Sequence, residues 1–258
     1  MHISRRLAIG TATIVTLLVV WPVLTLVTGT IDTGRFPSPI QFWQSLRQIV
    51  SVGYADGTLW QHAIQSLKLV VLGFTVAVSF GIPLGLLMGW SHRAEAFINP
   101  VFLLIRPIPP LAWIPLAILW LGLGDAAKIM VIFFAAFVPA VINTFTGIRM
   151  IEPHIIEAAS MLGTGRSRLV MEVLLPGAAP MIFTGLRLSL QASWTTLVAA
   201  ELVGAITGLG RVLNVAQTDI YPAMVLVGML AVGVLGWATT RILARVESRL
   251  MPWLSTRA

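Results

Sequence analysis

The 258-residue sequence contains no cysteine, and this absence removes several classes of site at once. Disulfide bonds, thiolate metal sites and cysteine nucleophiles are all excluded. Histidines are few and scattered, with no pair at the spacing of metal ligands. They are His2, His62, His92 and His154. The sequence therefore predicts no metal centre.

Charge is also scarce, because only 10% of the residues are Asp, Glu, Lys or Arg. In soluble domains about a quarter of the residues are charged. The low charge and the mean hydropathy of +0.90 are therefore those of a membrane-embedded protein. The net charge of +7 is not gathered into a basic patch with interleaved aromatic residues. This distribution argues against nucleic-acid binding and is typical of membrane loops.

A glycine-rich phosphate loop ending in Lys-Ser or Lys-Thr is missing as well. The chain therefore cannot hydrolyse ATP by that route. Any energy that it uses must come from a partner or from a gradient.

Apolar segments long enough to cross a bilayer are abundant, since a helix needs about 20 residues to span the hydrocarbon core. Six such segments cover residues 7–29, 63–90, 99–123, 127–148, 179–203 and 221–244. The first follows Arg5 and Arg6, as in a signal peptide. Its 23 residues are too many for that role and no clear Ala-x-Ala site follows, so we expect an anchor.

The distribution of basic residues predicts the orientation. With a cytoplasmic N-terminus, ten arginines fall inside, namely Arg5, Arg6, Arg93, Arg149, Arg166, Arg168, Arg241, Arg245, Arg249 and Arg257. Only four basic residues fall outside, namely Arg35, Arg47, Lys128 and Arg211. The positive-inside bias therefore places both termini and the loop 149–178 in the cytoplasm.

Two further patterns concern helices. In the outside connection 30–62, Phe42, Leu46, Ile49 and Val50 recur at helical spacing, so we expect either a short surface helix or a plain linker.

In the second span, Gly81, Gly85 and Gly89 stand at steps of four. On a helix they form a groove in which another backbone approaches closely, which predicts a packing role.

Candidate pathway residues lie in the third and fifth spans. The third contains RPIPPLAWIPL, whose prolines remove backbone donors and do not fit a regular helix interior. Arg106 in this segment either marks a pathway or extends to the cytoplasmic headgroups. The fifth span carries a small polar stripe formed by Ser189, Ser193, Thr196 and Ala200, and then Glu201. The stripe serves either packing or a translocation path, and Glu201 is either a path residue or part of a capped helix end.

Residues 157–176, EAASMLGTGRSRLVMEVLLP, form a charged stretch between apolar spans. Helical spacing before Gly163 and Gly165 predicts one short helix, and 166–174 predicts a second that ends before Pro176. Such a bent pair suits insertion into a groove on another protein. The alternative is a connector whose arginines only set the topology.

This stretch resembles the EAA loop of the membrane subunits of ABC importers. Every position of that spacing is matched, by Glu157, Ala158, Ala159, Gly163, Val173, Leu175 and Pro176. FPSP, RPIPPLAWIPLAILWLGLGDAAK and SWTTLVAAELVGAITGLG resemble the branch of permeases for nitrate, taurine and alkanesulfonates, and the resemblance runs from about residue 35 to 245. The run WTTLVAAEL is most similar to the taurine and sulfonate permeases.

The resemblance implies an all-α membrane protein of the bacterial inner membrane, with six transmembrane helices in the type I ABC importer permease fold and one permease domain over residues 1–258. It implies a homodimer of permeases, two cytoplasmic ATPase subunits that alone bind ATP, a periplasmic substrate-binding protein and no cofactor in this chain. The residues expected at the ATPase contact are Glu157, Ala158, Ala159, Ser160, Gly163 and Arg166. The expected substrate is a small organic anion, taurine or another sulfonate, with nitrate, aromatic acids and thiamine-precursor pyrimidines as alternatives.

Two other classes of function fit the sequence less well. A gradient-driven secondary carrier would need a proton or sodium relay, but no paired intramembrane carboxylates or inverted repeat are visible. An intramembrane enzyme would need a nucleophile with a base, or a metal constellation, and none of the serines has a histidine placed on a facing helix. The sequence accordingly predicts a non-catalytic chain.

Overall fold

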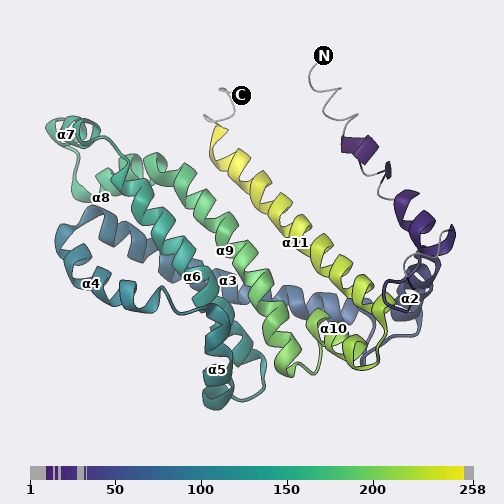
Figure 1. Ribbon diagram of the computed structural model, residues 1–258. Coiled ribbons are helices and arrows are strands. Elements are labelled where there is room, and N and C mark those ends of the chain that lie inside the picture. Colours follow the sequence, from purple (N-terminus) through teal and green to yellow (C-terminus); the bar gives the residue numbers. More distant parts are fainter. Residues whose placement is uncertain (1–9, 14, 17–18, 28–31, 33, 253–258) are drawn as a thin grey trace. The chain divides into compact units, whose positions relative to one another are not determined.

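The structure is a computed structural model that describes residues 10–13, 15–16, 19–27, 32 and 34–252 (Figure 1). These residues hold helices and no β-strand, and an isolated bridge joins Tyr54 to Gly57. The helices are α2 (Pro39–Ser51), α3 (Leu59–Trp90), α4 (His92–Ile105), α5 (Ile114–Leu121), α6 (Asp125–Arg149), α7 (Pro153–Met161), α8 (Arg166–Arg168), α9 (Leu175–Gly204), α10 (Leu209–Thr218) and α11 (Pro222–Leu250). Short π-helical segments cover Val23–Val27 and Leu169–Leu174, and a 3-10 turn covers Pro110–Trp113. The predicted all-α fold is confirmed.

Several of these helices are long and apolar enough to cross a membrane. In the described part of the chain they are Leu59–Trp90, Asp125–Arg149, Arg166–Gly204 and Pro222–Leu250, and a bent pair of helices forms a fifth candidate. The first expected span, 7–29, lies partly outside the described residues. The count of six and the orientation therefore stay predictions.

The third expected span, 99–123, is broken rather than continuous. Helix α4 begins at His92, where the Ser91 side chain accepts a hydrogen bond from the backbone N–H of Ala94, and it ends at Ile105. The chain then bends by 81° before the segment Pro110–Leu121. Pro107, Pro109 and Pro110 cause the break, because each lacks a backbone donor and each ring excludes the carbonyl of the preceding turn.

Contacts within the chain define two compact units. One comprises the described residues up to Ala63 together with Ile206–Val232, and the other comprises Ile64–Ala205 with the described residues from Gly233 onward. Two of the boundaries fall inside α3 and α11, and the third falls between α9 and α10. The long central helices α3, α6 and α9 pack together in the second unit.

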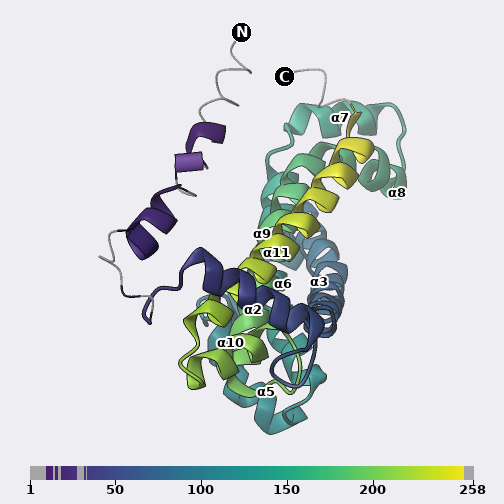
Figure 2. The ribbon, with the colours of Figure 1, turned by 90° about the vertical axis from the view of Figure 1, so that its right-hand side faces the viewer.

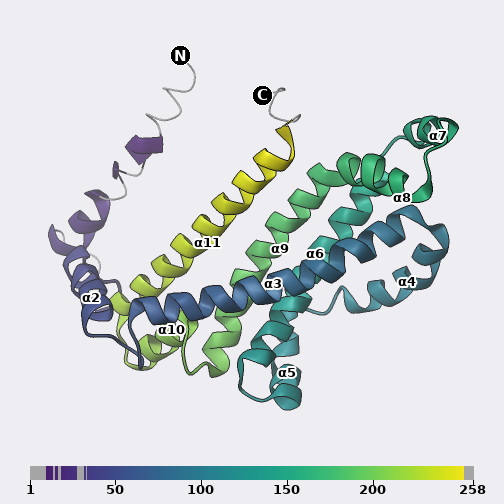
Figure 3. The same cartoon turned by 180° about the vertical axis from the view of Figure 1, so that it is seen from behind.

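Small residues bring α3 against α6 (Figure 3). A Cβ added to Gly85 would lie 2.6 Å from the carbonyl oxygen of Val141 and 2.7 Å from the Cβ of Thr144. Similar overlaps would occur at Gly81 against Ala140 and at Gly89 against Ile148. The predicted glycine groove is thus occupied by α6, and its role is packing.

Helix α9 lies along another face of α6, and the two ribbons run side by side in Figures 1 and 3. A Cβ on Gly147 of α6 would meet Met181 at 2.8 Å, and one on Gly185 of α9 would meet Asn143 at the same distance. The contact is therefore set by small residues contributed from both helices. This close approach maximises van der Waals contact, which replaces the hydrophobic driving force that is missing in lipid.

The first unit is built around α2, α10 and the start of α11. Helix α2 begins with a capping box, in which Ser38 and Gln41 satisfy each other's backbone N–H groups. Its Ile49 is fully buried with Val212 and Met224. The helix expected in the connection 30–62 is confirmed, and its apolar face packs on α10 and α11 (Figure 2).

Buried polar groups fix the turn between α2 and α3 in the same unit. His62 is fully buried, and its Nδ1 accepts the backbone N–H of Gly208 at 3.1 Å, so Nε2 donates to the carbonyl of Tyr54 at 3.0 Å. The Tyr54 hydroxyl donates to Asp219 at 2.6 Å. Burial raises the pKa of the Tyr54 phenol, and the hydrogen bond to Asp219 raises it further, so this donor stays protonated.

The loop 149–178 contains the predicted short helix before Gly163, but its second part differs from the expectation. Pro176 does not end a separate helix, because Arg166–Gly204 is helical throughout. Within it, Leu169–Leu174 is π-helical, and the Leu175 N–H bonds to Val170 five residues earlier. Pro176 follows this π-helical turn by two residues, and the altered hydrogen-bond pattern there accommodates its missing N–H within a continuous helix.

Replacing Gly85 with valine should destabilise the protein, because its new side chain would overlap the α6 backbone. Overpacking of this kind costs about 1–3 kcal/mol, so the thermal unfolding midpoint in detergent should fall clearly. The control is Gly233→Ala in α11, where an added Cβ meets nothing within 4 Å. Equal midpoints for the two variants would contradict this account of the α3–α6 contact.

Candidate functional site

The charged loop contains the short helix α7, whose two ends are defined by specific residues. Pro153 occupies its first turn, and the preceding Glu152 pairs with His154 at 2.9 Å. At the other end the N–H of Gly163 bonds to Ser160 and that of Thr164 bonds to Ala159, which is a Schellman motif. Gly163 has φ +75°, a conformation that side chains disfavour, so glycine is required for this bend.

Little of α7 is covered by the rest of the chain. Glu157, Ala158 and Ser160 are exposed and Ala159 is half-buried, while Ile156 packs inward on the cluster around Leu174. Met161 and Leu162, at the bend, are 87% and 86% exposed. Small, apolar and acidic groups therefore form one accessible surface, at the end of the α6–α9 pair (Figure 1).

The charges on this loop are free to meet a partner. Arg166 is exposed at the start of the helical run that leads into α9, and Glu157 is exposed on α7. Neither forms an ion pair with any other residue in the part of the chain that the structure describes. Together with Ala158, Ala159, Ser160 and Gly163, they are the coupling residues that the sequence predicts, and the structure brings all six into one exposed loop.

The polar stripe of α9 lies between helices. Ser189 and Ser193 are fully buried and Thr196 is 4% exposed. The Ser189 hydroxyl donates to the carbonyl of Ala136 in α6 at 2.6 Å, and Ser193 donates to the carbonyl of Ser189 at 2.8 Å. This geometry favours the packing interpretation of the stripe, and a pathway role for these three residues stays a prediction.

Glu201 is also buried, with 1% of the residue exposed. The Ser66 hydroxyl in α3 contacts both of its carboxylate oxygens, at 2.8 and 3.1 Å. A buried carboxylate is tolerated only when it is hydrogen-bonded. This geometry favours the structural interpretation of Glu201, and its participation in a pathway stays a prediction.

Arg106 has a different environment, because it caps α4 at the 81° break and is exposed. It lines a hollow of about 210 Å³ together with residues from both sides of the break and from α6. Trp113 and Phe134 form one wall, stacked with ring centroids 4.0 Å apart. Of the five predicted pathway residues, Arg106 lines this hollow, whereas the other four are buried.

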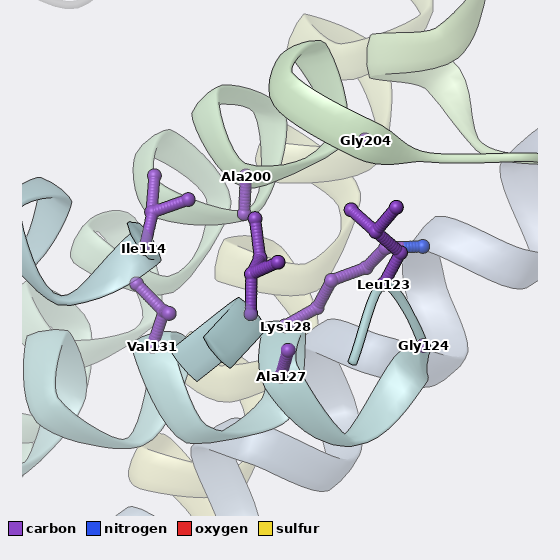
Figure 4. A pocket seen from close by; sticks show the side chains of 9 residues that line it. Ile114, Leu123, Gly124, Ala127, Lys128, Val131, Ala200 and Gly204 are labelled. Atoms are coloured by element: carbon purple, nitrogen blue, oxygen red, sulfur yellow. The ribbon is translucent and has the colours of Figure 1, made fainter. Parts of the chain in front are cut away.

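Sequence reasoning missed Lys128, which was expected in an outside loop. It lies in the first turn of α6 with only 8% of its side chain exposed, among Ile114, Leu123 and Val131 (Figure 4). Its Nζ is 3.6 Å from Asp125, which in turn accepts a hydrogen bond from Gln65. The space beside it is about 10 Å³, no larger than one water molecule, so Lys128 is a structural ion-pair residue.

The sequence had one signal for this pair. Asp125 and Lys128 stand three residues apart, a spacing at which helical side chains meet.

No group of three potential metal ligands occurs among the residues that the structure places.

Comparison with known families identifies the family of this chain. Residues 81–252 match the family described as the binding-protein-dependent transport system inner membrane component. The chain belongs to this family. The match includes α7, the bend at Gly163 and the whole of α9, so the exposed loop lies within the region that matches the family.

Individual relatives agree with this assignment. The chain is 37% identical over 253 residues to the taurine transport system permease protein TauC of Escherichia coli (strain K12), covering 97% of this chain and 91% of that protein. It is 32% identical to the putative aliphatic sulfonates transport permease protein SsuC of Bacillus subtilis (strain 168), covering 87% and 80%. An inward-facing structure of the MetNI methionine ABC transporter has the same fold, with a TM-score of 0.60, 20% identity, and coverage of 73% of this chain and 95% of that chain.

The protein is thus an ABC importer permease and a multi-pass protein of the bacterial inner membrane. Its relatives are permease subunits, which form the membrane component of such importers. The type I permease fold inferred from the sequence is confirmed by the structural match.

Replacing Gly163 with alanine should loosen the end of α7, because a side chain at φ +75° costs about 1–2 kcal/mol. Amide hydrogen exchange at residues 162–164 should become faster. Gly165→Ala is the control, since Gly165 has a φ of −65° and an added Cβ there meets nothing within 4 Å. Unchanged exchange in Gly163→Ala would show that the Schellman turn is not what fixes the bend.

Proposed function

We propose that this permease imports taurine or another sulfonate as part of an ATP-driven complex. The complex would contain a second copy of this chain, two cytoplasmic ATPase subunits and a periplasmic substrate-binding protein. ATP is bound by the ATPase subunits alone, and this chain needs no cofactor. The observation that carries the substrate class is the 37% identity to a taurine permease along 97% of the chain.

The exposed face of α7 is the proposed contact with the ATPase. Its support is the combination of a full EAA spacing, small side chains at Ala158 and Ala159, and a Schellman bend that leaves Met161 and Leu162 uncovered. Small residues let a partner surface approach the helix backbone, and the exposed apolar pair supplies area to bury.

Movement of α7 has a direct mechanical route into the membrane helices. Ile156 of α7 packs against a buried cluster that includes Leu174 and Ala178, which belong to the continuous helical run Arg166–Gly204. That run of 39 residues is about 58 Å long at 1.5 Å per residue, enough to cross a bilayer. A displacement of α7 would therefore be transmitted to α9 and, through their close packing, to α6.

Reconstitution with the ATPase and binding protein tests this function. Wild-type complex in liposomes should accumulate radiolabelled taurine or an alkanesulfonate only with ATP, and excess nitrate should compete poorly. Uptake without ATP would contradict the assignment to an ATP-driven importer. Strong competition by nitrate would contradict the substrate class.

Reversing the charge of Glu157 should uncouple the complex. In Glu157→Lys, substrate-stimulated ATP hydrolysis should fall about tenfold or more, because the reversed charge would face the ATPase surface at a buried contact. The matched control is Glu152→Lys, which makes the same charge change at an exposed residue just before α7 begins. If both variants lose coupling equally, α7 has no specific docking face.

A further inference from the structure

Arg106 is a guanidinium without a charged partner in a region that should be apolar. No carboxylate of the described residues lies within ion-pair distance of it, although Lys and Arg side chains elsewhere in the described chain form four ion pairs. Its neighbours Leu104 and Ile105 are exposed apolar residues at the end of α4, which is half of a candidate span. A charge placed in such a segment requires water or an anion.

The backbone around Arg106 offers few other donors for an anion. Pro107, Pro109 and Pro110 have no N–H, and the N–H groups of Arg106 and Ile108 are bonded to Phe102 and Ile105. The guanidinium is therefore the main hydrogen-bond donor at the break. The prolines also restrict the backbone next to Arg106, which reduces the backbone ordering that binding would require.

The hollow beside Arg106 has an apolar side as well as this cationic one. The stacked rings of Trp113 and Phe134, 9° from parallel, face it together with Ile108 and Val138. No acidic residue lines it. Its volume of about 210 Å³ leaves room for a small organic ligand.

We propose that this hollow is a substrate subsite for small sulfonates with a short apolar body. Arg106 binds the sulfonate oxygens, for which its planar fork is well matched, and the Trp113–Phe134 wall packs against the alkyl chain. The inference rests on the proposed function for the class of substrate. It adds the location of the site, and it assigns recognition of the sulfonate group and of the alkyl group to different residues.

Direct binding to the permease–ATPase complex in nanodiscs, without the binding protein, tests the subsite. The probes are methanesulfonate, propanesulfonate and butanesulfonate, measured by titration calorimetry. Wild type should bind the longer chains more tightly, by up to about fourfold per methylene. Arg106→Gln should weaken all three about tenfold or more, and Arg106→Lys should weaken them less, because it keeps the charge but loses the bidentate geometry.

Two further variants separate the roles of the site residues. Trp113→Ala should remove the increase in affinity with alkyl-chain length, while methanesulfonate should still bind. Arg47→Gln is the matched control, because Arg47 also lies beside a tryptophan, with its guanidinium carbon 5.5 Å from the Trp43 ring centre, but on α2. Wild-type affinity in Arg106→Gln, or equal losses in Arg47→Gln and Arg106→Gln, would overturn the proposal.

A phospholipid phosphate is the other anion that Arg106 would attract. If phosphatidylglycerol nanodiscs abolish sulfonate binding while phosphatidylcholine nanodiscs permit it, and Arg106→Gln no longer retains phosphatidylglycerol, the site belongs to lipid and the proposal fails. ATP-dependent uptake is measured in parallel. Uptake that is insensitive to Arg106→Gln overturns the subsite alone, whereas sulfonate binding without ATP-dependent uptake overturns the proposed function and leaves the subsite standing.

Discussion

Close backbone approach between α6 and its neighbours is the constraint on which the membrane unit depends. Lipid is as apolar as leucine, so helices in a bilayer gain little by burying large apolar side chains against one another. They gain by packing tightly, and here glycines on α3, α6 and α9 make that possible. The buried hydroxyl of Ser189 adds a hydrogen bond to the α6 backbone at the same interface.

This packing links the exposed loop 149–178 to the membrane helices. The α6–α9 pair holds both ends of the loop, and α7 projects between them with its outer face uncovered. A loop fixed at both ends and bent at one glycine transmits displacement better than a flexible linker would. At the break beside Arg106, a cation in an apolar setting persists only where an anion or water meets it.

The sequence predicted those features that follow from local chemistry. The glycine steps of α3 correctly indicated a helix contact, and the spacing of Phe42, Leu46 and Ile49 correctly indicated a helix. The bent element around Gly163 was also found from sequence, since only glycine suits that conformation. The break at Pro107–Pro110 was detectable as irregular backbone, but its 81° angle depends on how α5 packs against α6.

Other features depend on tertiary context and were missed. Pro176 was expected to end a helix, and the π-helical turn that accommodates it has no simple sequence signature. Lys128 was assigned to an outside loop when the basic residues on the two sides of the membrane were counted. Burial of its side chain depends on the apolar residues of α5 and α9 around it, and their proximity is a property of the fold.

Accessibility of α7 in the assembled transporter tests the central claim, that this helix docks the ATPase. The chain has no cysteine, so Ala158→Cys introduces a single thiol on the exposed face of α7. A membrane-impermeant maleimide should label it in inside-out vesicles that hold the permease alone, and added ATPase subunits should protect it. Equal labelling with and without the ATPase would contradict the claim.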